Sequence, residues 1–124
     1  MIKLYNIHNE DHTSNKNNFY IGRGSILGNP FTHDGKRSSL AKLSFKTAEE
    51  AINAYKLYFK EMYLTDIEFK NEFDKIFDLY KNGEDIYLQC FCYPKPCHGD
   101  VIIEELQKKL IKESLQKIKK RAVS

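Results

Sequence analysis

The residue types best suited to chemistry lie in one segment, Cys90–Asp100, which reads Cys-Phe-Cys-Tyr-Pro-Lys-Pro-Cys-His-Gly-Asp. We expect a helix to begin near its last three residues, which places Cys97 and His98 at a helix N-terminus. Such a terminus favours anions, lowers the pKa of a thiol and offers backbone donors to a phosphate. The segment therefore predicts catalytic groups, with Cys97 as nucleophile and His98 or Asp100 as its acid–base partner.

Two other interpretations of the segment stay open. Zinc is one, because Cys90, Cys92, Cys97 and His98 have the types of a Cys₃His site, although their spacing differs from the usual paired knuckles. The other is structural: a free cysteine packs as a small hydrophobe, which suits Cys90 and Cys92 in a core. Asp100 could likewise cap the helix without taking part in any reaction. No metal or other cofactor is the main expectation, and zinc is the alternative.

A second candidate segment is the glycine-rich loop Tyr20–Phe31. Glycines let the backbone turn tightly and approach a ligand, and consecutive N–H groups then form a concavity that binds anions. Arg23, between two glycines, could fork onto a phosphate or pair with a surface acid. The spacing matches neither the P-loop nor the dinucleotide fingerprint. The residues predicted to bind a ligand are Gly22, Arg23, Gly24, Ser25, Gly28, Asn29 and Pro30, together with Gly99.

Alternating and helical patterns predict the elements that position these segments. Strands are expected at Met1–His8, at Phe19–Ile21 and, central in the sheet, at Glu84–Cys92. Capping boxes at Thr47/Glu50 and Thr65/Glu68 open two helices, the second ending before Asn82–Gly83, and the third helix starts near His98–Asp100. We therefore predict one α/β domain over residues 1–124, with a mostly parallel sheet of about three to four strands flanked by about three helices.

Composition and charge narrow the class of protein. The 124 residues fit one domain, and the net charge of +3 conceals an uneven distribution. The positive excess lies in residues 108–124, which we expect to be a basic helix end or tail. Nucleic-acid binding is therefore only a weak prediction, because a basic patch on a folded face would be a stronger sign of it. No apolar run reaches the roughly 20 residues of a membrane span, and no signal-peptide core is present. We expect a cytoplasmic protein with no membrane partner and reduced thiols.

Together the two segments resemble the domain-of-unknown-function 4326 family of phages and bacteria. Its members share Tyr-Ile-Gly-Arg-Gly-Ser-x-Leu-Gly-Asn-Pro-Phe and Cys-x-Cys-x-Pro-x-x-Cys-His-Gly-Asp, which appear here as Tyr20–Phe31 and Cys90–Asp100. Phe91 stands where an aromatic such as Trp is common. The resemblance implies that both motifs belong to one shared site, and it suggests a small accessory protein that acts on a nucleotide or a nucleotide-derived signal.

The position of the motifs favours a common ligand site. Ligands of open α/β sheets bind beyond the carboxyl ends of the strands, and each motif follows a strand. If those strands are parallel neighbours, both motifs meet at one rim. We therefore expect this rim to bind a phosphate-containing small molecule, with hydrolysis or transfer of that molecule as a further option. The alternatives are a zinc or nucleic-acid module that uses the cysteines and the basic tail, and a protein that binds a host protein.

Overall fold

The central strand of the sheet is paired on both sides, as the alternating residues of the 84–92 segment predicted. The computed structural model describes residues 1–32, 43–44, 47–91, 93, 95 and 97–123. Its elements, in chain order, are β1 (Ile2–Asn6), β2 (Asn18–Tyr20), β3 (Phe31–Thr32), β4 (Leu43–Ser44), α1 (Ala48–Thr65), α2 (Ile67–Lys81), β5 (Ile86–Cys90) and α3 (Gly99–Val123). The predicted class is confirmed: a small α/β unit with three helices and a three-stranded parallel sheet.

The main sheet has the order β1-β5-β2, and both pairs are parallel. The register sets Leu4 and Phe19 on either side of Leu88. The short β3 and β4 form a separate parallel pair. Since β2 and β5 are parallel neighbours, the condition for the two motifs to meet is fulfilled.

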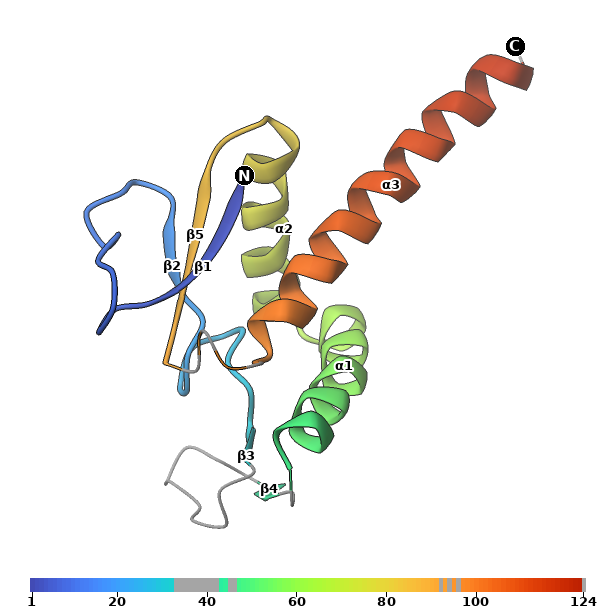
Figure 1. The fold of residues 1–124 in the computed structure, drawn as a ribbon. Coiled ribbons are helices and arrows are strands. Elements are labelled where there is room, and N and C mark those ends of the chain that lie inside the picture. Colours follow the sequence, from blue (N-terminus) through green and yellow to red (C-terminus); the bar gives the residue numbers. More distant parts are fainter. Residues whose placement is uncertain (33–42, 45–46, 92, 94, 96, 124) are drawn as a thin grey trace.

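The two faces of the sheet are covered differently (Figure 1). Side chains of β5 that point to one face, Ile86, Leu88 and Cys90, are buried in the core with residues of all three helices. Across the sheet, the loop between β1 and β2 covers the other face. There the His12 ring stacks on Tyr87 with centroids 4.7 Å apart and meets Tyr5 edge-on at 5.0 Å.

Helix starts follow the expected capping chemistry, with one shift. The Thr47 hydroxyl accepts the Glu50 N–H at 3.1 Å, as predicted. The second cap is Asp66 and not Thr65: the Asp66 carboxylate accepts the Phe69 N–H at 3.0 Å. Thr65 still belongs to α1 and donates its hydroxyl proton to the Glu61 carbonyl at 2.8 Å. Asp caps a helix as well as Thr does, so sequence alone left the exact residue undecided.

The basic segment continues α3 beyond the domain. The outer half of this helix projects away from the other elements (Figure 1). Its first two lysines are ion-paired, Lys108 with Glu104 at 3.1 Å and Lys109 with Asp74 at 3.0 Å. Nucleic-acid binding by this helix stays a prediction. Within the part of the chain that the structure describes, every helix is too short or too polar to cross a lipid bilayer.

We expect Asp66→Ala to lower the free energy of unfolding by about 1 kcal/mol, because the first turn of α2 loses the acceptor for its Phe69 N–H. Urea denaturation measures this loss. Asp66→Asn retains an acceptor oxygen and is the matched control, which should remain close to the wild type. Equal losses in both variants would contradict the capping role.

Candidate functional site

The glycine-rich loop and the start of α3 meet where β2 and β5 end. Tyr20 is level with Gln89 in the parallel register, and the Ile21 N–H donates to the Gln89 carbonyl at 2.9 Å. The chain then leaves β2 into the loop and leaves β5 toward Cys97. Both candidate segments therefore extend from the carboxyl edge of the same sheet, where α/β proteins bind ligands.

A buried histidine joins the two segments. His98 Nε2 lies 2.5 Å from the Ile21 carbonyl oxygen, and the side chain is only 6% exposed. A carbonyl accepts only, so Nε2 must carry the proton, and in the neutral ring Nδ1 carries the lone pair. This bond ties the first residue of the loop to the residue that precedes α3. We call it the His98 clasp.

Burial lowers the pKa of His98 to about 4. The hydrogen bond to Ile21 acts in the opposite direction, the positive charge of Arg23 lowers this pKa further, and Asp100 raises it. The imidazole is therefore neutral near pH 7. Arg23 lies two residues after Ile21, in the loop that the His98 clasp holds.

Tyr55, which was not among the predicted site residues, forms a second clasp. The Tyr55 hydroxyl donates to the Leu27 carbonyl at 2.7 Å, and its ring meets His98 edge-on with centroids 5.1 Å apart. Burial raises the pKa of Tyr55 well above its usual value, so the hydroxyl keeps its proton. The available signal was a tyrosine among apolar core residues, because a buried hydroxyl needs a hydrogen-bond partner. The partner itself could not be inferred, because Leu27 is remote from Tyr55 in the sequence.

Between the two clasps the loop makes consecutive turns. The Gly22 carbonyl accepts the Ser25 N–H at 3.1 Å and the Ser25 hydroxyl at 2.7 Å, and Gly28 N–H donates to the Ser25 carbonyl at 3.0 Å. Gly24 has φ +89°, a conformation that suits glycine. A Cβ on Gly28 would lie 2.5 Å from the Gly22 carbonyl oxygen. The loop therefore closes on itself through a contact that only glycine permits.

Arg23 folds back over this loop. Its Nη1 donates to the Asn29 carbonyl, and the side chain is half-buried. A guanidinium carries five N–H donors, and this bond uses one of them. Asn29 thus contributes a backbone oxygen to the loop, and the binding of a ligand by its side chain stays a prediction. Pro30, also half-buried, follows it directly.

The start of α3 is capped by Cys97 and Asp100. The Cys97 thiol accepts the Gly99 N–H at 3.3 Å, and the Asp100 carboxylate accepts the Cys97 N–H at 3.3 Å. This reciprocal pair has the form of a capping box. Gly99 is buried, and a Cβ there would lie 2.5 Å from the Leu4 side chain. The structural role that the sequence left open for Asp100 is therefore present.

The two described cysteines of the segment are in contact. Cys97 Sγ lies 3.7 Å from Cys90 Sγ, and the exposed fractions are 3% and 1%. Cys92, the third cysteine of the zinc hypothesis, lies outside the described residues. Among the residues that the structure does describe, no group of three or more Cys, His, Asp or Glu is arranged to hold a metal.

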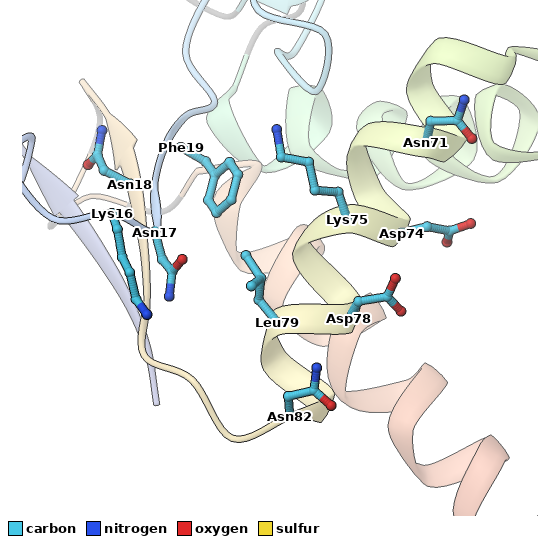
Figure 2. Close-up of a pocket in the computed structure, with 10 residues that line it drawn as sticks. All are labelled: Lys16, Asn17, Asn18, Phe19, Asn71, Asp74, Lys75, Asp78, Leu79 and Asn82. Carbon is cyan, nitrogen blue, oxygen red and sulfur yellow. The ribbon is translucent and has the colours of Figure 1, made fainter.

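Two hollows lie between β2 and α2, and the smaller of them reaches the rim. The smaller, about 260 Å³, is lined by Tyr20, Ile21 and Ser25 on one side and by Glu72 and Ile76 of α2 on the other. Figure 2 shows the larger groove, about 840 Å³, between β2 and α2, with Lys75 extending from α2 toward the Phe19 ring. Among the predicted site residues that the structure describes, Ser25 alone lines either hollow.

Comparison with known proteins identifies the family. The model of the family described as Domain of unknown function (DUF4326) matches residues 5–108. The chain therefore belongs to this family, as its two motifs indicated. No curated protein and no solved structure matches it. The match contains the whole of both candidate segments and ends where the basic part of α3 begins.

We expect stability to fall as the pH falls from about 6.5 to about 4, because His98 takes up a proton in the unfolded chain well before it does so in the folded one. Across this pH range, the free energy of unfolding should fall by roughly 3 kcal/mol. Urea denaturation at several pH values measures it. His98→Gln keeps a donor for Ile21 but cannot titrate, so its curve should be flatter; parallel curves for the two proteins would contradict this role.

Proposed function

We propose that the rim formed by Gly22–Pro30 and Cys97–Asp100 binds a phosphate-containing small molecule, a nucleotide or a nucleotide-derived signal. The observation that carries this proposal is the His98 clasp, which holds the glycine-rich loop against the N-terminus of α3. We also infer that the chain is a phage or bacterial accessory protein and that it acts in the cytoplasm.

Electrostatics support an anionic ligand. The aligned peptide dipoles of α3 place partial positive charge at Gly99, at the end of the helix that adjoins the loop. The guanidinium of Arg23 adds a full positive charge, and its field already helps to lower the pKa of His98. A phosphate near both groups would interact with the helix terminus and form charge-assisted hydrogen bonds with the arginine.

Binding is better supported than catalysis. The Nε2 proton of His98 is engaged by Ile21, so only Nδ1 of the neutral ring could accept a proton. The thiol of Cys97 is buried and caps the helix, and Asp100 is committed to the Cys97 N–H. These contacts favour positioning roles for the three residues predicted to be catalytic. Hydrolysis or transfer would require a ligand that reaches His98 Nδ1 or Cys97 Sγ.

We expect Arg23→Gln to weaken the binding of ADP by about ten-fold or more, as the loss of a hydrogen bond to a charged group implies. Arg23→Lys, which keeps the charge but not the planar fork, should fall between this variant and the wild type. Titration calorimetry measures the three affinities, and urea denaturation shows whether each loop variant is folded.

Arg121→Gln is the matched control, because it removes the same charge from the exposed end of α3. It should leave ADP binding unchanged. If the wild type does not bind ADP, or if Arg121→Gln weakens binding as much as Arg23→Gln does, the proposal is wrong.

One specific distance supports zinc binding as a second candidate. Tetrahedral zinc with Zn–S bonds of ~2.3 Å sets its sulfur ligands about 3.8 Å apart. Cys90 and Cys97 are separated by 3.7 Å. Cys92 would be the third ligand, and His98 could offer only Nδ1 while the clasp is intact. The same separation also suits two thiols that pack in a core, so metal analysis must decide.

For zinc binding we expect one zinc per chain in protein purified without chelator, and its loss in Cys97→Ser. Elemental analysis measures the ratio. Protein that contains well under one zinc per chain, and whose thermal unfolding does not respond to added zinc, would eliminate this candidate.

A further inference from the structure

The rim carries exposed aromatic side chains beside the proposed phosphate site. Among the phenylalanines whose side chains are described, Phe91 alone is exposed, at 53%, whereas Phe59, Phe69, Phe73 and Phe77 are buried. Its ring lies 5.9 Å from the Tyr20 ring and 5.9 Å from the His8 ring, between centroids. Tyr20 is 40% exposed, and His8 is exposed as well. We call these three side chains the aromatic rim.

The aromatic rim follows the carboxyl ends of all three strands of the main sheet. His8 comes two residues after β1, Tyr20 ends β2, and Phe91 follows β5 directly. The Asn6 side chain holds the backbone at Phe91 in place, because its amide donates to the Phe91 carbonyl at 3.0 Å and to the Tyr93 carbonyl at 3.4 Å. The sheet and these hydrogen bonds therefore position the backbone from which the Phe91 ring extends.

Tyr20 links the aromatic rim to the loop that carries Arg23. Its hydroxyl donates to the Arg23 carbonyl at 3.0 Å. Its ring lies against Gly22, where a Cβ would come within 2.4 Å of the ring atoms. Gly22 therefore does more than permit a turn: it admits an aromatic ring directly beside the arginine. The Tyr20 ring and the backbone of Arg23 therefore lie at the same edge of the sheet.

We propose that the aromatic rim stacks the base of the ligand whose phosphate lies near Arg23, so that the rim selects a nucleotide over a simple sugar phosphate. This inference rests on the proposed function and adds the class of ligand to it. Stacking uses the π-face that every base has, and it discriminates weakly among bases. Purine and pyrimidine nucleotides should therefore bind with similar affinities, while a phosphate without a base binds more weakly.

Titration calorimetry with AMP, UMP and ribose 5-phosphate tests the inference. Stacking on an aromatic side chain contributes about ten-fold in affinity per base. We expect AMP and UMP to bind about ten-fold more tightly than ribose 5-phosphate, and Phe91→Leu to reduce AMP affinity toward that of ribose 5-phosphate. Ile118→Ala, which truncates an exposed apolar side chain on the outer half of α3, is the control and should bind AMP as the wild type does.

The outcomes separate the two proposals. If none of the three compounds binds, both the phosphate site and the base stacking are wrong. If AMP and ribose 5-phosphate bind equally and Phe91→Leu has no effect, the phosphate site stands and the stacking is wrong. A short oligothymidylate that binds far more tightly than UMP would overturn the small-molecule assignment and point to single-stranded nucleic acid.

Discussion

The arrangement of the rim depends on one buried hydrogen bond, from the His98 imidazole to the Ile21 carbonyl. The two residues are 77 positions apart in the chain. The bond joins the residue that follows β2 to the residue that precedes α3, the helix that comes after β5. An unpaired carbonyl or imidazole would be costly at this depth, so each group holds the other in place. The same burial keeps the imidazole neutral at physiological pH, so only the ring nitrogen that bonds to the Ile21 carbonyl carries a proton.

Other features of the rim are consistent with this constraint. The Tyr55 hydroxyl fixes the far end of the loop at Leu27, and its ring packs against His98, so the two clasps support each other. Gly28 and Gly99 stand where a Cβ would collide with the Gly22 carbonyl and with Leu4. The loop and the helix start thus approach closely because these positions carry no side chain. The loop is therefore held by contacts from α1 and from the start of α3.

Sequence reasoning predicted the features that local patterns encode. The pattern of residues 84–92 predicted β5, and the Thr47 capping box predicted the start of α1. Apolar residues on both faces of that strand did not reveal which face would be the more deeply buried one. The meeting of the two motifs was also predictable once parallel strand order was assumed. The contact between the Tyr55 hydroxyl and the Leu27 carbonyl was not predictable, because nothing in the neighbouring residues reveals which remote carbonyl a buried hydroxyl will reach. The cap of α2 shifted by one residue since Thr65 and Asp66 are both competent caps.

The claim that both motifs form one anion site is tested most directly by following backbone amide resonances while inorganic phosphate and then ADP are titrated into the protein. A shared site predicts that amides of residues 22–28 and 97–101 shift together and yield the same dissociation constant. Shifts confined to the basic half of α3, or to only one of the two segments, would contradict the account.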